Sequence, residues 1–310
     1  MKKLIPIGII LIIFSGCATL TTSQLESISK YSSAAKEYSD YPSILVKKYV
    51  NVQNDIFILS NSYKANPERG SHNIYSHYKN RKDLLNEVEK LDLSFKILKE
   101  YAKNLEVIST TDYTKKISDN AETIGTNLDT LLNIYNEKFD KEIPEGIGSF
   151  VYKSIVFIGK KHIDKKRSEL LKKYIEKGNV IIEELSKTSK TFLEENASKE
   201  WISGLDEELK KAHLGLRQQI LVDTANYPSN VYNVLLVDEK VSEIYNEIYY
   251  LETMNKSLIK SVENLYKAHN ALYENTKQKQ KMDEILNDVS SFITDVYELI
   301  EIHNEFKSEE

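Results

Sequence analysis

The chain has 310 residues, enough for one large domain or two smaller ones, and its formal net charge of −5 gives it no general attraction to nucleic acid. Its 41% hydrophobic and 29% charged residues exclude an intrinsically disordered protein and predict a packed core. Gly (10) and Pro (5) are too scarce for the many tight turns of a sandwich or barrel, so the composition favours helices.

The first predicted element is a cleavable export signal over residues 1–16. Lys2 and Lys3 precede an apolar run from Leu4 to Phe14, and Ser15 and Gly16 supply the small residues of a cleavage site. A helix that spans a bilayer needs about 20 apolar residues, so this shorter run predicts a signal and not a permanent span.

The residues Phe14-Ser15-Gly16-Cys17 resemble the lipobox of bacterial lipoproteins, whose usual form is Leu, a small residue, Gly or Ala, and then Cys. The resemblance covers only the leader, and Phe14 departs from the usual Leu. It implies that Cys17 is acylated and becomes the N-terminus, so that two or three acyl chains anchor the body stably to a membrane. Ala18 stands where an inner-membrane retention signal has Asp, which favours the outer membrane if the source is Gram-negative. The alternative is an ordinary secretory signal with an incidental Cys.

Residues 17–33 are rich in Ser and Thr after the Cys and predict a short tether that carries the lipid. Residues 34–310 are predicted to form a helical bundle domain, with a subdivision near 140–146 left open. Cys17 is the only Cys, so the exported body has no disulfide framework and no thiolate for a metal.

Long stretches of the body carry apolar residues at steps that alternate between four and three. The clearest stripe consists of Leu84, Val88, Leu91, Phe95, Leu98, Ala102 and Leu105, and the same rhythm recurs over 45–63, 117–135, 171–185, 244–272 and 282–299. Such heptad stripes face a helical core. Helix breakers cluster at 66–70, 110–112, 140–146, 195–198 and 226–229. The sequence therefore predicts an all-α fold, an elongated antiparallel bundle of long, heptad-patterned helices.

Several polar and aromatic residues lie on these stripes. Tyr49, Tyr63, Tyr135 and Tyr174 are predicted to pack in the core with a wet hydroxyl, and Trp201 opens another core-facing stripe. Asn255, His269 and His303 lie at or beside seams, where a polar residue either fixes helix register or serves as a ligand. We interpret them as residues that fix register or lie at a partly wetted edge of the core.

The sequence lacks the motifs of common catalytic and metal sites. None of its six His has Glu three residues before it, as a di-iron bundle requires, and there is no Gly-rich phosphate loop and no Gly-x-Ser-x-Gly elbow. We therefore expect no enzyme, no cofactor and no metal site, while an enzyme or ligand carrier that uses a cavity between helices is left open.

The most unusual stretch is the apolar segment 146–159. Its apolar residues cover most of a helix circumference, and Lys160, Lys161, Lys165, Lys166 and Arg167 follow it. The segment is either a buried central helix followed by a solvated basic turn, or an element that enters a membrane beside its headgroups. The residues concerned are Ile147, Phe150, Val151, Ile155, Val156, Phe157 and Ile158.

These features predict a lipid-anchored protein of the cell envelope, held to the membrane by its N-terminal acyl chains. Its helical bundle is expected to act as a non-enzymatic protein-interaction or structural module with a protein partner and without nucleic acid. The alternative is a membrane-active helical protein, broadly similar in architecture to helical pore-forming toxins, in which segment 146–159 enters the bilayer.

Overall fold

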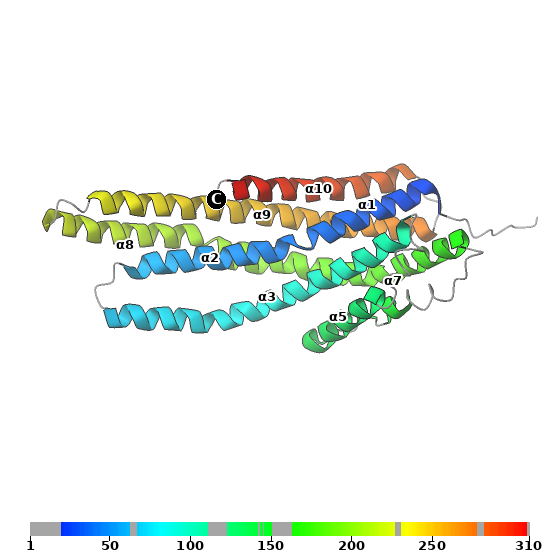
Figure 1. Ribbon diagram of the computed structural model, residues 1–310, viewed down its shortest axis with the longest axis horizontal. Coiled ribbons are helices and arrows are strands. Elements are labelled where there is room, and N and C mark those ends of the chain that lie inside the picture. The colour runs from blue at the N-terminus through cyan, green and yellow to red at the C-terminus, as the bar shows by residue number, and fades with distance from the viewer. Residues whose placement is uncertain are drawn as a thin grey trace, which may run out of the picture.

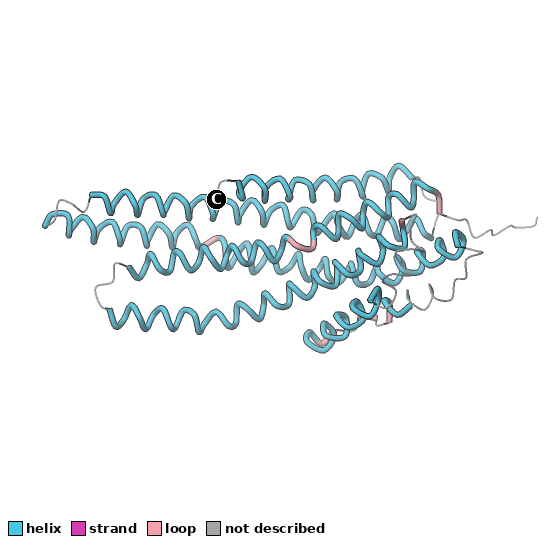
Figure 2. Tube along the Cα trace, viewed as in Figure 1, coloured by secondary structure: helices cyan, strands magenta, loops and turns pink. Residues whose placement is uncertain are grey.

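The computed structural model describes residues 20–62, 67–110, 123–141, 143–144, 146–150, 163–226, 231–277 and 282–308. Within these ranges the chain forms helices and turns and no strand. The helices lie along one long axis and make an elongated bundle (Figures 1 and 2). The predicted all-α bundle is therefore confirmed.

The helix boundaries follow most of the predicted breaks. The helices are α1 (Thr22–Tyr38), α2 (Tyr41–Ser62), α3 (Pro67–Ser109), α5 (Thr123–Phe139), α7 (Ile163–Thr191), the π-helix η1 (Phe192–Ile202), α8 (Leu205–Asn226), α9 (Val231–Lys277) and α10 (Met282–Ser308). Pro67 opens α3, a position where its missing N–H costs nothing. The break predicted at 195–198 is wrong, because η1 continues through these residues and the helix is interrupted only at Ser203 and Gly204.

The Ser- and Thr-rich stretch 19–33 is a helix from Thr22 onward, so most of the predicted tether belongs to the bundle. Thr21 caps α1 and forms a capping box with Gln24. The hydroxyl of Ser27 donates to the carbonyl oxygen of Ser23 at 2.9 Å, which satisfies its polarity inside the helix. Ile28 is buried on the core face. A polar composition therefore conceals an amphipathic helix.

The bundle has two unlike ends. At the N-terminal end, the backbone N–H of Leu20 donates to Ser168 of α7 at 3.0 Å, and Gln24 of α1 bonds Asn275 of α9 at 3.3 Å. Here α9 packs with α1, α7 and α10, and α3 packs with α1, α5 and α7. At the opposite end, which we call the hairpin end, α8 and α9 lie side by side as a two-helix hairpin and reach past the end of α2 and the start of α3 (Figure 1). The 47 residues of α9 span about 70 Å between these ends.

Helix α10 covers only part of α9. It packs along α9 and α1, and its C-terminus lies near the middle of the bundle (Figure 1). Beyond that point α2, α8 and α9 contact one another without α10. A surface of α2 and α9 is thereby left open just past the end of α10.

The loop near 140–146 is fastened to the helix before it. Asp140 adopts a left-handed conformation (φ 48°) that ends α5, and the side-chain amide of Asn136 bonds both the N–H and the carbonyl oxygen of Ile143, at 3.0 and 2.9 Å. Residues before and after this loop belong to the same hydrophobic core cluster.

Candidate functional site

The core of the N-terminal end contains a buried aromatic and polar cluster around His269. The Tyr101 hydroxyl lies 2.7 Å from Nε2 of His269, and Nδ1 lies 3.0 Å from Oδ1 of Asn179. Because this amide oxygen can only accept, Nδ1 carries the proton and Nε2 accepts from Tyr101. Tyr101 also stacks on Tyr174, with ring centroids 4.8 Å apart. These bonds tie α3, α7 and α9 to one another.

Burial controls the electrostatics of this cluster. It lowers the pKa of His269 to about 3, so the imidazole is neutral at physiological pH. Burial likewise raises the pKa of Tyr101 well above its usual value. Gly178 of α7 is buried against the Tyr101 ring, where a side chain would overlap the ring. A closed, neutral and tightly packed cluster fixes the register of the helices, as the sequence predicted for His269.

The other seam residues also lie at helix contacts. Asn255 is buried and donates to the carbonyl oxygen of Leu193 in η1 at 3.2 Å. Trp201 is half-buried and stacks on Tyr49 of α2, with centroids 5.0 Å apart. Tyr49, Tyr135 and Tyr174 are buried, while Tyr63 lies outside the described residues.

The basic run after segment 146–159 does not end in a solvated residue. Arg167 is buried, and its Nε donates to the carbonyl oxygen of Ile108 at 2.8 Å while Nη2 donates to that of Ser109. These bonds satisfy carbonyl groups at the C-terminus of α3, where a cation is favourable. The expectation of a solvated or headgroup-facing basic turn is therefore wrong for Arg167.

The described start of segment 146–159 belongs to the core. Ile147 is completely buried, and Phe150 packs against the core beneath the ammonium group of Lys177. Asp129 of α5 accepts from the backbone N–H groups of Gly148 and Ser149, both at 2.8 Å, and so fixes this turn. The remaining candidate residues lie outside the described residues, and these are Val151, Ile155, Val156, Phe157 and Ile158, together with the lipidation candidate Cys17.

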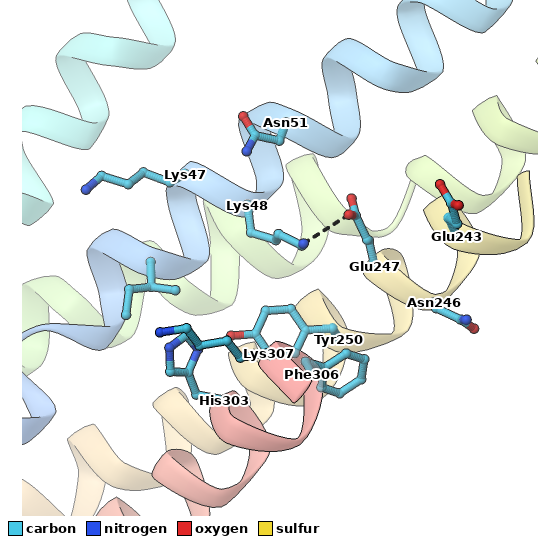
Figure 3. Close-up of a pocket in the computed structure, with 11 residues that line it drawn as sticks. Lys47, Lys48, Asn51, Glu243, Asn246, Glu247, Tyr250, His303, Phe306 and Lys307 are labelled. Carbon is cyan, nitrogen blue, oxygen red and sulfur yellow. Dashed lines mark hydrogen bonds and ion pairs between the residues drawn. The ribbon is translucent and has the colours of Figure 1, made fainter. Parts of the chain in front are cut away.

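A surface pocket of about 750 Å³ lies where α10 ends against α2 and α9 (Figure 3). We call it the α10-end pocket. Helix α2 contributes Ile44, Lys47, Lys48 and Asn51, helix α9 contributes Glu243, Asn246, Glu247 and Tyr250, and α10 contributes His303, Phe306 and Lys307. Its position follows from the fold, because it occupies the place that one more turn of α10 would cover.

Ion pairs and an aromatic cluster shape this pocket. Lys48 of α2 pairs with Glu247 of α9 at 2.9 Å across the floor (Figure 3). Two turns farther along both helices, Lys240 pairs with Asp55 at 3.1 Å. These ion pairs hold α2 against α9 where α10 no longer covers them. At the other side, Nδ1 of His303 lies 3.0 Å from the Tyr250 hydroxyl.

The lining chemistry suits a polar ligand with an apolar group. Lys, Glu, Asn and His make up eight of the eleven lining residues. Sites for small organic ligands are predominantly apolar and bury most of the ligand, so this pocket differs from them. Ile44 and Phe306 supply apolar contact, and three lysines outnumber two glutamates. A polypeptide segment that carries a carboxylate and an apolar side chain matches this mixture.

The sequence did not indicate this pocket. His303 was singled out on the seam of α10, and the structure does place it in the pocket. One feature of the sequence could have indicated the pocket. The face of α9 that meets α10 is apolar after Tyr250, but before Tyr250 it carries the polar residues Asn246 and Glu243. The position at which α10 ends against that face depends on tertiary packing, which local sequence patterns do not indicate.

Two further findings concern the described part of the chain. No group of three or more His, Cys, Asp or Glu in it is placed to hold a metal ion. None of its helices combines the length and the apolar character needed to cross a membrane.

Comparison of the chain with protein-family models, with curated proteins and with solved structures gives no significant match.

Proposed function

We propose that this chain is a lipid-anchored protein of the cell envelope whose helical body is a non-enzymatic protein-interaction module, with the α10-end pocket as its docking site. The observation that carries the proposal is the mixed lining of the pocket, in which charged, amide and imidazole side chains stand beside the apolar side chains of Ile44 and Phe306. Protein-binding surfaces commonly combine polar and apolar groups in this way.

The proposed anchor suits this role. Cys17 precedes Leu20 by three residues, and Leu20 is bound to α7 at the N-terminal end of the bundle. The acyl chains would therefore hold that end to the membrane. The 27 residues of α10 run from this end to the pocket and span about 40 Å. A bundle that stands upright on this membrane would hold the pocket clear of the lipid headgroups, where another envelope protein can reach it.

The partner is expected to present an acidic group beside an apolar side chain. Lys47 of α2 and Lys307 of α10 both line the pocket and are expected to supply donors for a carboxylate (Figure 3). Ile44 and Phe306 receive the apolar side chain. Charged donors at the rim of an interface contribute more to the association rate and to specificity than to affinity. Because salt screens exposed charges, added salt should weaken the complex.

The anchor is tested by metabolic labelling with a palmitate analogue. The wild-type chain should incorporate the label and the Cys17→Ser variant should not, since its sulfur is the acylation site. A variant at an ordinary leader position, Ser15→Ala, serves as a control that should still be labelled. Labelling of Cys17→Ser to the wild-type level would refute the lipoprotein assignment.

The docking site is tested by site-specific photo-crosslinking in the native envelope. A photoreactive residue at Asn51 or Asn246, both exposed in the pocket, should give one shared crosslinked product. The same residue at exposed Glu169 on α7 is the matched control and should not give it. Lys47→Glu with Lys307→Glu should reduce the product severalfold. Equal products from all three positions would show that the pocket is not the docking site.

A further inference from the structure

The α8–α9 hairpin carries large apolar side chains that the fold leaves uncovered. Leu214 and Leu221 of α8 are 60% and 57% exposed, and Leu235, Tyr245 and Tyr249 of α9 are 57%, 54% and 61% exposed. We call these five residues the hairpin stripe. Monomeric proteins expose single apolar side chains often, but a row of five on two adjacent helices is a mark of an interaction surface.

Helix geometry places the hairpin stripe on one face. Arg217 of α8 and His213 both contact Asp238 of α9, at 3.6 and 2.7 Å, so these residues mark the flank where the two helices meet. Leu214 and Leu221 stand three residues before and four residues after Arg217, and Leu235 and Tyr245 stand three before and seven after Asp238. Residues at these spacings share a helix face. The stripe therefore runs along both helices beside the same ion pair.

The hairpin has no buried core of its own near its tip. From His213 to Leu221 on α8, and from Val234 to Glu243 on α9, every described side chain is half-buried or exposed. Two helices alone bury too little apolar surface to make a stable unit, whereas four can enclose a seam. A second pair of helices with a matching apolar face would complete such a four-helix unit.

The charges of the hairpin are complementary to those of another copy of itself. Residues 209–222 of α8, the stretch toward the hairpin tip, contain three basic residues and no acidic one, while Asp206, Glu207 and Glu208 precede this stretch and Asp223 follows it. Residues 231–247 of α9 contain four acidic residues and one basic one. In a two-fold pair of hairpins, α8 of each copy lies beside α9 of the other, so the basic stretch 209–222 of one copy meets the acidic stretch 231–247 of its partner.

We infer that a second copy of this chain docks on the hairpin stripe and completes a four-helix bundle at the hairpin end. The two-fold axis runs parallel to the long axis of the molecule, so α8 of one copy is antiparallel to α9 of its partner. This axis keeps both N-terminal ends on the same side. The inference goes beyond the proposed function, because it requires neither the lipid anchor nor the α10-end pocket.

A membrane is a poorer occupant of the same surface. The hairpin tip lies about 70 Å from the N-terminal end, and Asp238, Glu239 and Glu243 stand on the helix that carries most of the stripe. Acidic residues beside an apolar face are repelled by anionic lipid. They are attracted to the basic stretch 209–222 of α8 in a second copy.

The size of the stripe sets the expected affinity. From Leu235 to Tyr249 it extends about 21 Å, and two helices are about 20 Å wide, which gives about 400 Å² on each copy. The total of about 800 Å² is smaller than the roughly 1,200 to 2,000 Å² of stable specific complexes and falls among weak, transient ones. We therefore expect a reversible dimer with a dissociation constant in the micromolar range, and tighter pairing when both copies are held on one membrane.

Sedimentation equilibrium of the body from Ala18 to Glu310 tests the inference. All described core residues lie after Leu20, so this body keeps the complete described core. Its mass should rise from monomer to dimer between about 1 and 100 µM. Leu214→Glu with Leu221→Glu should remain monomeric with unchanged helicity, and the dissociation constant should rise at least tenfold. Tyr297→Glu, equally exposed but on α10, is the matched control and should dimerise as the wild type does.

A chemical crosslink locates the interface independently. The body contains no Cys, so Ser242→Cys on α9, which lies between the stripe residues, introduces a single thiol. A short bismaleimide should link two such bodies, and should not link bodies with Ser291→Cys on α10. A wild type that stays monomeric at 100 µM, or a dimer that survives both leucine substitutions, would overturn the inference. Co-sedimentation of a monomeric wild type with anionic vesicles would instead assign the stripe to a membrane.

Discussion

The two ends of the bundle use the same kind of heptad-patterned helix with opposite results. At the N-terminal end each helix has several neighbours, and Tyr101, Tyr174 and His269 are fully enclosed. At the hairpin end, α8 and α9 have one another and little else, and Leu214 and Leu221 face outward. An apolar stripe indicates which side of a helix is stabilised by burial. The number of neighbouring helices decides whether burial is achieved.

The difference also separates two kinds of role. Closed packing at the N-terminal end gives a rigid base, because buried polar groups such as His269 and Asn179 are bonded to each other across helices. The uncovered apolar side chains of the hairpin end are available for binding. Stability is expected to concentrate at the first end and binding at the second.

The largest expected effect comes from placing a carboxylate at each end. Ile147→Asp should bury an unpaired charge in the core and destabilise the body by several kcal/mol, on the order of 4, in urea unfolding. Leu214→Asp, the matched change at the hairpin end, should alter the free energy of unfolding of the monomer by less than about 0.5 kcal/mol. Similar losses from both would remove the contrast between the ends.

The same variants address the membrane-active alternative. The wild-type body should release no dye from liposomes, because Ile147 is enclosed by the bundle. A wild type that releases dye, together with a stable Ile147→Asp variant that does not, would support insertion of segment 146–159 into the bilayer.

The next largest effect concerns the packing of a single glycine. Gly178→Ala should destabilise the protein by about 3 kcal/mol, because the added methyl group would overlap the Tyr101 ring, which Tyr174 and His269 hold in place. Gly204→Ala is the control, since the space around it is open, and it should leave stability unchanged or raise it by about 0.5 kcal/mol. Chemical denaturation measures both. An unaffected Gly178→Ala would show that the N-terminal core is looser than its geometry indicates.

The sequence predicted the fold class, but it did not predict these packing details. The heptad stripes predicted long antiparallel helices because every apolar pattern had the same period. They failed for α1, where Ser27 bonds back to its own helix, and for 195–198, where η1 keeps the chain helical. Period and composition describe one helix at a time. Tyr101 on Gly178, and the α10-end pocket, depend on which helices meet.

A smaller effect is expected from acid on the buried imidazole. The pKa of His269 is about 3 in the folded protein and about 6.5 when the chain is unfolded, so between these values only the unfolded chain binds the proton. The stabilisation is complete above pH 6.5 and is lost as the pH falls toward 3, by about 2 kcal/mol at pH 5.

Urea unfolding at pH 7 and pH 5 measures this effect. His269→Gln should lose about 2 kcal/mol less than the wild type over this step, since its amide does not titrate. The groups that face His269 are the uncharged Tyr31, Tyr101 and Asn179, so no neighbouring charge is expected to mask the change. Equal losses in the wild type and His269→Gln would contradict the buried neutral imidazole.

The smallest expected effect concerns exposed ion pairs, which occur at both ends. Lys99 pairs with Asp40 at 2.6 Å near the N-terminal end, and Lys211 pairs with Glu207 at 3.3 Å at the base of the hairpin. Solvent screens both pairs, so Lys99→Ala and Lys211→Ala should each cost less than about 1 kcal/mol, and less still in 1 M salt. Thermal unfolding of the monomer at low and high salt measures the two losses. Equal, small losses of stability in the two variants would mean that ion pairs contribute alike at both ends. The difference in stability between the ends would then come from buried packing. A loss from Lys211→Ala of several times that from Lys99→Ala would instead show that ion pairs hold the hairpin in place of a core.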